Sequence, residues 1–319
     1  MSTHHQFFIL GPLTVHGVHG PVRLGGNRQR VLLTLLLLEA NRVIGTDRLI
    51  EAVWREAPPA TVRSQLRICV SGLRRLLSAA GVAAFIETHP SGYLIRVPRS
   101  HIDLAHFEDL LCRARAEARS ASPERALTLF QQALQLWQGP VGVGLGSELL
   151  ETVALKVNED RLSAIEDRFE LELALGRHRQ VLGELARHVT ENPFMESLCA
   201  QLMLALYRCG RTAEALSVYR DTRRRLAREL GLEPGERLRR MERMILDGSA
   251  AGDASTVLPQ SGLLAGPYAQ THEPQDRIAH LEREIAELRA AHLRHGRTTV
   301  LGDPTPMTTV LGDPAPADR

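Results

Sequence analysis

Glycines lie at the ends of the predicted helices in a long helical stretch of this chain, and their spacing is the strongest constraint on its fold. From residue 104 to residue 246 apolar residues recur with helical periodicity, and the segments end near Gly139, Gly176, Gly210, Gly231 and Gly248. The pattern predicts helices at 104–119, 124–137, 149–175, 178–191, 195–209, 212–230 and 235–246. Gly176 and Gly210 lie 34 residues apart, the period of tetratricopeptide helix pairs. We therefore predict an all-α, tetratricopeptide-like repeat domain at 101–247, with a groove that binds a partner.

The composition limits the class of protein. Hydrophobic residues make up 44% of the chain but aromatic residues only 4%, so its cores are expected to consist mainly of Leu, Val and Ala. No apolar run reaches the roughly 18 residues that span a bilayer, and the N-terminal segment has no basic leader before a long apolar region. We therefore predict a cytoplasmic protein without a membrane partner.

Cysteines and glycines do not form a recognisable chemical site. Cys69, Cys112, Cys199 and Cys209 include no C-x-x-C pair, so we expect buried, reduced thiols and no metal. The segment QGPVGVGLGSE (138–148) follows a predicted helix and is not followed by Gly-Lys-Ser/Thr, which favours an interhelical loop over a nucleotide site. No catalytic set of Ser, His and Asp is evident, so the sequence predicts no enzyme activity and no cofactor.

A different pattern precedes the helical region. Residues 6–24 alternate short apolar runs with Gly-Pro and His-Gly breaks, which is typical of a small antiparallel sheet. Three helices and a β-hairpin are predicted to follow at 27–40, 46–54, 61–80 and 85–97. Thr46 is a suitable N-cap for the second helix. This order of elements predicts a winged helix-turn-helix domain at 1–100.

The charge of the chain is concentrated in this first domain. Residues 1–100 contain 12 Arg and 5 acidic residues, whereas residues 101–247 contain 21 basic and 23 acidic residues. Residues 248–319 contain 6 basic and 9 acidic residues. The asymmetry indicates that the first domain alone binds a polyanion.

The third predicted helix has two faces of different chemistry. Its apolar arc consists of Val62, Leu66, Val70, Leu73 and Leu77. The opposite arc carries the candidate DNA contacts Arg63, Ser64, Arg67, Ile68, Ser71 and Arg75, with Arg74 on its flank. A solvated helix normally mixes charges, but no acidic residue lies between Glu56 and Glu87. Arg can form a forked contact with guanine and Ile68 can meet a thymine methyl group, whereas the alternative is an ordinary Arg-rich surface.

The predicted hairpin adds two weaker candidates. Arg96 and the ring of Tyr93 are placed to reach the DNA backbone or the adjoining minor groove. Tyr93 fits a role in core packing equally well.

The C-terminal residues differ from both domains in composition. Residues 248–274 have the Gly, Ala, Ser and Pro content of a linker, and 277–293 place apolar residues at heptad spacing, as in a short coiled coil. TTVLGDP then occurs twice in a tail predicted to be disordered. Its adjacent threonines are candidate phosphorylation sites: Thr298, Thr299, Thr308 and Thr309. Recent duplication of a segment without function explains the repeat equally well.

Several motifs, in order, resemble one family of regulators. They are LGGNRQRVLLTLLLLEANRVIGTDRLIEAVW (24–54), LRICVSGLRRLL (66–77), SGYLIRV (91–97), HIDLAHFEDL (101–110), ALQLWQGP (133–140) and 204–246. Over about residues 6–247 the chain is similar to the Streptomyces antibiotic regulatory protein family, in which an OmpR-type winged helix precedes a bacterial transcriptional activation domain. Gly72 departs from the family pattern, because similar proteins often carry Arg there. The loop VGVGLG after Gly139-Pro140 is less polar than is usual.

The resemblance implies a function that agrees with the charge pattern. Family members are expected to bind direct repeats in double-stranded promoter DNA as homodimers. They are also expected to recruit RNA polymerase to secondary-metabolite (antibiotic) gene clusters. The sequence shows no ATPase module and no receiver domain, so aspartate phosphorelay is not implied. We therefore predict a transcriptional activator, with a helical-repeat protein-interaction adaptor in signalling as the alternative.

Overall fold

The computed structural model describes residues 5–248 except for residues 56, 57 and 121. The predicted linker, the coiled-coil-like segment 277–293 and the threonines of the TTVLGDP repeats lie outside the described residues. The described chain is mainly helical, with small antiparallel sheets near its N-terminus, which confirms the predicted fold class.

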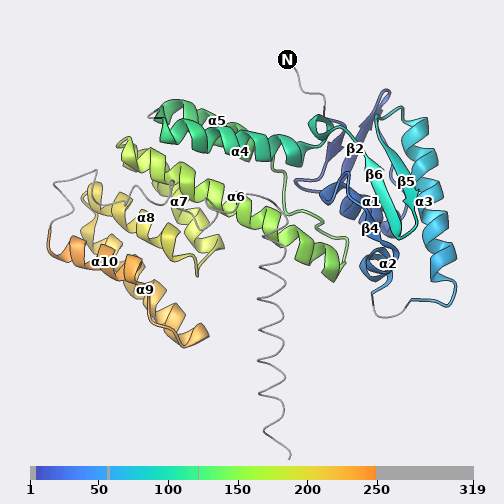
Figure 1. The fold of residues 1–319 in the computed structure, drawn as a ribbon. Helices are drawn as coiled ribbons and strands as arrows, with labels where there is room; N and C mark the ends of the chain where they lie inside the picture. The colour runs from blue at the N-terminus through green and yellow to red at the C-terminus, as the bar shows by residue number, and fades with distance from the viewer. Residues whose placement is uncertain (1–4, 56–57, 121, 249–319) are drawn as a thin grey trace, which may run out of the picture. The chain divides into compact units, whose positions relative to one another are not determined.

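The first part of the described chain has the elements predicted for a winged helix (Figure 1). These elements are β1 (Phe7–Phe8), β2 (Thr14–Gly17), β3 (Gly20–Pro21), α1 (Asn27–Leu38), β4 (Ile44–Gly45), α2 (Thr46–Trp54), α3 (Val62–Ala79), β5 (Phe85–His89) and β6 (Gly92–Arg96). Strands β1, β2 and β3 form one antiparallel sheet, and a second sheet has the order β4-β6-β5. Because β6 is the central strand of this second sheet, three of its side chains, Tyr93, Leu94 and Ile95, are buried.

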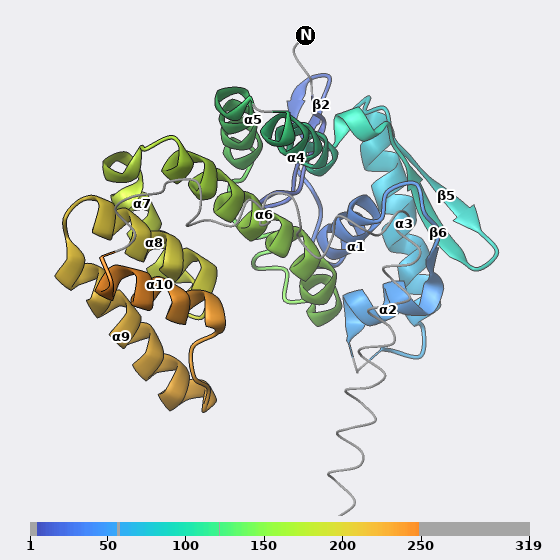
Figure 2. The same ribbon diagram turned by 60° about the vertical axis from the view of Figure 1, so that its left-hand side comes forward.

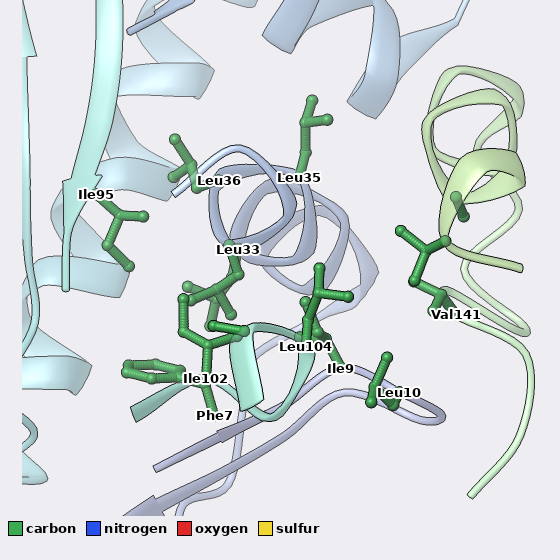
Figure 3. Packing of buried hydrophobic residues seen from close by; sticks show 14 of the residues in the cluster. Phe7, Ile9, Leu10, Leu33, Leu35, Leu36, Ile95, Ile102, Leu104 and Val141 are labelled. Carbon is green, nitrogen blue, oxygen red and sulfur yellow. The ribbon is translucent and has the colours of Figure 1, made fainter. Parts of the chain in front are cut away.

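Helix α1 lies at the centre of the first core (Figure 3). Every residue from Val31 to Leu37 is buried, so the helix presents apolar side chains all round, as expected for an enclosed helix. Figure 3 shows Ile95 of β6 beside this helix and Phe7 and Ile102 beneath it. Phe7 also forms a parallel β-bridge with Ile102, so the first strand is held against the segment that begins the helical region.

Seven helices follow, and each agrees with a predicted segment to within two residues. After a 3-10 turn at Arg99–His101 they are α4 (Asp103–Arg119), α5 (Pro123–Gln135), α6 (Glu148–Ala174), α7 (His178–Glu191), α8 (Glu196–Arg208), α9 (Thr212–Leu230) and α10 (Glu236–Leu246). Gly176, Gly210 and Gly231 have φ values of 77°, 77° and 68°. Residues other than glycine rarely adopt this left-handed conformation, so these glycines end their helices for a steric reason.

Two hydrophobic cores stabilise the described chain, and the first extends across residue 100. It joins the winged-helix elements to α4, α5 and much of α6. The second core is built from the C-terminal part of α6 with α7, α8, α9 and α10. Figure 2 shows α8 between its neighbours, and α8 packs against α7, α9 and α10. The winged helix therefore shares its interior with the first helices of the region that follows.

One predicted helix cap is wrong. The N-cap of α2 is Gly45, and no side chain caps this end of the helix. Thr46 is instead the first helical residue, and both its N–H and its Oγ1 donate to the carbonyl oxygen of Ser91, at 3.0 and 3.4 Å. A contact 45 residues away in sequence therefore replaces the expected local cap.

Candidate DNA-binding surface

Helix α3 divides into the two faces that its sequence indicates. Leu66, Val70, Leu73 and Leu77 are buried in the first core. On the other side Ile68 is 70% exposed, although its side chain is purely apolar. A single exposed apolar side chain is common on protein surfaces, so Ile68 is informative only together with the arginines around it.

The candidate residues around Ile68 are brought together on this surface. The predicted contacts on the arc are all solvent-exposed: Arg63, Ser64, Arg67, Ser71 and Arg75. Among the described residues, neither Arg67 nor Arg75 has an acidic partner. Their guanidinium groups are therefore available to a phosphate or a base edge.

Arg63 does have a partner, which the sequence of α3 alone does not reveal. Its Nη2 lies 3.1 Å from Oδ1 of Asp47 on α2. Both side chains are highly exposed, so the ion pair contributes little to stability and exchanges readily for a DNA phosphate.

Arg74 is bound by the wing rather than left free. Its Nε donates to the carbonyl oxygen of Ile86 at 2.8 Å, and its Nη2 donates to Oγ1 of Thr88 at 2.7 Å. The side chain therefore fixes β5 against α3. This geometry favours a positioning role for Arg74 over a direct contact with DNA.

The two candidates in the hairpin have different environments. Tyr93 is 8% exposed and belongs to the first core, which favours the core-packing interpretation that the sequence left open. Arg96 is exposed on β6, and its Nε lies 3.1 Å from Oε2 of Glu87 on β5. Arg96 therefore remains on the surface of the wing.

Arg28 is a further residue of this region, and sequence reasoning missed it. Its guanidinium lies over the Trp54 ring, 5.3 Å from the ring centroid, and its Nη1 donates to Oε1 of Gln65 at 3.1 Å. Arg28 thus links α1 to both α2 and the first turn of α3. No local pattern signals this link, because the partners lie 26 and 37 residues away.

Gly72 of α3 lies against the end of a side chain from α1. A Cβ atom at this position would come within 2.4 Å of Nε2 of Gln29. A larger side chain at this position would therefore displace only the flexible end of Gln29.

Polar contacts attach the winged helix to the helices behind it. Ser147, the N-cap of α6, donates from Oγ to the carbonyl oxygen of Ala52 on α2 at 2.7 Å, and accepts from the N–H of Leu150 at 3.3 Å. The Asn27 amide donates to the carbonyl oxygen of Leu145 at 2.8 Å. The glycine-rich loop between α5 and α6, predicted as an interhelical loop, thus also holds α1 and α2.

Asp103 makes the equivalent attachment at the start of α4. Its buried carboxylate accepts hydrogen bonds from the N–H groups of Ile9 and Leu10 at 2.9 to 3.0 Å, and from Leu104 at 2.8 Å. Burial raises the pKa of Asp103 to about 6, although these N–H donors act in the opposite direction. The carboxylate fixes the segment after β1 to the helical region.

The cysteines only partly follow prediction. Cys199 is buried, but Cys69 and Cys209 are half-buried and Cys112 is exposed, so burial of all four was wrong. All four are free thiols. Within the described ranges, no group of three or more His, Cys, Asp or Glu residues is arranged to hold a metal ion. None of the described helices is long and apolar enough to cross a membrane.

Two family models match the chain. The transcriptional regulatory protein C-terminal domain covers residues 21–95, and the bacterial transcriptional activator domain covers residues 102–246. Regulatory protein DnrI of Streptomyces peucetius is 34% identical over 250 residues, which cover 76% of this chain and 92% of DnrI. The chain belongs to the Streptomyces antibiotic regulatory protein family.

Two other relatives match most of this chain. Regulatory protein AfsR of Streptomyces coelicolor is 37% identical over 248 residues, or 77% of this chain, and the match spans only 24% of AfsR. A solved structure of Mycobacterium tuberculosis EmbR in complex with a low-affinity phosphopeptide is 34% identical. It superimposes with a TM-score of 0.72 over 77% of this chain and 65% of EmbR. AfsR is named a regulatory protein and EmbR a transcriptional regulatory protein, and the two family models are of the OmpR-type and activator-domain types that the sequence indicates.

Proposed function

We propose that this chain is a sequence-specific transcriptional activator of a secondary-metabolite (antibiotic) gene cluster, acting in the cytoplasm on promoter DNA. The observation that carries the proposal is the exposed face of α3, where Ile68 is 70% exposed beside Arg67, which has no acidic partner among the described residues. An apolar side chain beside free guanidinium groups matches the donor, acceptor and methyl pattern of the DNA major groove.

The contacts of α3 divide into two kinds. Arg67 and Ile68 lie at the centre of the exposed face, so we assign base contacts to them. Arg63 and Arg75 flank this centre on α3, and Arg96 is exposed on strand β6 of the wing. We assign these three arginines to phosphates, which position the protein without reading sequence.

Arg67→Ala tests the proposal most directly. If its guanidinium forms a forked contact with a base, promoter affinity should fall by about 1 to 3 kcal/mol, and specificity at that position should relax. Arg125→Ala is a matched control, because Arg125 is an exposed arginine on α5. Gel shifts at several salt concentrations measure both variants. Equal promoter affinity of folded Arg67→Ala and the parent chain would contradict the assignment of α3.

We further propose that two protomers bind direct repeats and recruit RNA polymerase through the helical domain. Both recognition helices must enter the same face of the duplex, so the half-sites should lie about one helical turn, roughly 10 base pairs, apart. Footprinting on promoters with half-turn insertions measures this spacing. An inverted repeat, or tolerance of the insertion, would contradict it.

The alternative function is a protein-interaction adaptor in which the winged helix binds a protein. The exposed arginines of α3 and the relatives named as regulators favour the activator. A gel shift separates the two, because an adaptor would show no preference for promoter over scrambled DNA.

Regulation through the TTVLGDP repeats is a separate proposal. Phosphorylation at Thr298, Thr299, Thr308 or Thr309 would add about −1.5 to −2 charges per site and compete with DNA for the basic domain. Mass spectrometry of the native protein and promoter assays on a chain truncated after Gly248 measure this effect. Absence of phosphothreonine, together with unchanged activation, would identify the repeats as a spacer.

A further inference from the structure

The outer face of α9 forms a shallow, arginine-lined hollow in the second half of the described chain. The hollow has a volume of about 600 Å³ and is lined by Ser217, Arg220, Arg223, Arg224, Ala227 and Glu233. We call this surface, together with Leu230 and Leu232, the α9 groove. It involves none of the residues assigned to DNA.

The α9 groove already holds a carboxylate of its own chain. Arg223 directs Nε and Nη2 at the two carboxylate oxygens of Glu233, at 2.9 and 3.4 Å. Glu233 lies in the loop between α9 and α10, so it occupies the position that an incoming acidic group would take. Both side chains are more than half exposed, so the pair is weak and can be exchanged at little cost.

A second guanidinium in the groove lacks an acidic partner. Arg220 uses Nε to donate to the carbonyl oxygen of Leu216 at 3.2 Å, which holds the side chain along the helix. Among the described residues no carboxylate pairs with Arg220. The groove therefore presents more positive charge than its own acidic residues neutralise.

Apolar side chains extend the same helix face towards the C-terminal end of α9. Ala227 and Leu230 follow Arg220 and Arg223 at helical spacing, and Leu230 is 50% exposed. Leu232 is 56% exposed, although its backbone N–H is fixed by the carbonyl oxygen of Leu226 at 3.2 Å. Arginines next to exposed leucines are typical of protein interfaces, whereas contacts with DNA phosphates do not need leucines.

We propose that the α9 groove binds a partner protein through a segment that presents acidic side chains followed by large aliphatic ones. Carboxylates of the partner displace Glu233 from Arg223 and pair with Arg220. Aliphatic side chains then cover Leu230 and Leu232. The inference rests on the proposed function, because it identifies the surface through which this activator contacts its target while α3 holds the promoter.

A labelled peptide tests the groove without DNA. The probe is a fluorescent amphipathic peptide with Asp on its first turns and Leu on the following turns, titrated against the full chain. Affinity should fall at least about tenfold in the double variant Arg220→Glu, Arg223→Glu. Glu233→Gln should bind about two- to fivefold more tightly, because it releases Arg223. Arg239→Glu with Arg243→Glu on α10 carries the same charge change outside the groove and should bind like the parent chain.

Promoter binding and transcription are then measured on the same variants. The groove variant should retain promoter affinity in gel shifts, but lose activation in transcription with purified RNA polymerase holoenzyme from the native host. Thermal melting by circular dichroism identifies a misfolded variant, in which case Arg220→Gln replaces the double change. Unchanged peptide affinity in the folded groove variant, or lost promoter affinity, would overturn the proposal. Failure of the parent chain to bind its promoter would instead refute the proposed function.

Discussion

Ser147 offers a sharp test of the attachment between the winged helix and the helical domain. Its hydroxyl is buried and makes two hydrogen bonds, donating to the Ala52 carbonyl and accepting from the Leu150 N–H. In Ser147→Ala, α6 loses its N-cap, which costs about 1 kcal/mol. The Ala52 carbonyl loses the donor at 2.7 Å, and an unsatisfied buried acceptor costs about 1 to 3 kcal/mol.

The two losses add to an expected decrease of about 2 to 4 kcal/mol in the free energy of unfolding. Denaturation of the full chain by urea, followed by circular dichroism, measures this decrease. Ser147→Asp is a second test, because its carboxylate can still accept from Leu150 but has no hydrogen to donate to Ala52. The buried carboxylate would face the Ala52 carbonyl oxygen, so this variant should be no more stable than Ser147→Ala.

Thr152→Ala is the matched control, since this exposed hydroxyl donates only to the Glu148 carbonyl within α6. It should change stability by less than about 0.5 kcal/mol. The reasoning is refuted if Ser147→Ala has an equally small effect, because the Ser147–Ala52 contact would then not stabilise the folded chain.

Three further predictions follow from the described contacts. Arg74→Ala removes both hydrogen bonds to β5 and should weaken promoter binding by about 1 to 2 kcal/mol in gel shifts. Arg74→Lys cannot reproduce the forked contact and should restore little of this affinity. Unchanged promoter affinity of Arg74→Ala would remove its positioning role. Burial raises the pKa of Glu166 to about 7. The nearby Arg237 lowers this pKa, whereas the carboxylates of Asp167 and Glu170 raise it further. Between pH values of about 8 and about 4 the folded chain binds a proton that the unfolded chain releases, so the free energy of unfolding rises as pH falls through this range. Glu166→Gln should be more stable than the parent chain by about 1 to 3 kcal/mol near pH 8, and this difference should vanish at low pH. A pH-independent difference in urea denaturation would argue against this assignment. If Arg67 contacts a base, Arg67→Ala should reduce the slope of log affinity against log salt concentration only slightly. Arg75→Ala should reduce this slope by about 1, the amount expected for one lost phosphate contact. Equal slopes for the two variants would contradict the division between base and phosphate contacts.

The sequence by itself determined the secondary structure of the described chain. Helix periodicity and helix-ending glycines are local properties, so all seven helices behind the winged helix were predictable to within two residues. The left-handed φ of Gly176 and Gly210 is the steric reason that a glycine stands where these helices end. The faces of α3 were predictable for the same reason, because a rotation of about 100° per residue places Arg67 and Leu66 on different sides of the helix.

Only the tertiary structure decided which of these side chains are free to meet DNA. Arg74 and Arg67 look alike in sequence, but the wing folds back so that Ile86 and Thr88 bind the guanidinium of Arg74. Burial of Tyr93 likewise depends on β4 and β5 pairing on both sides of β6. The physical reason is that such contacts join residues distant in sequence, 95 positions apart for Ser147 and Ala52 and 118 for Asn27 and Leu145. No local periodicity encodes which distant group a polar side chain will meet.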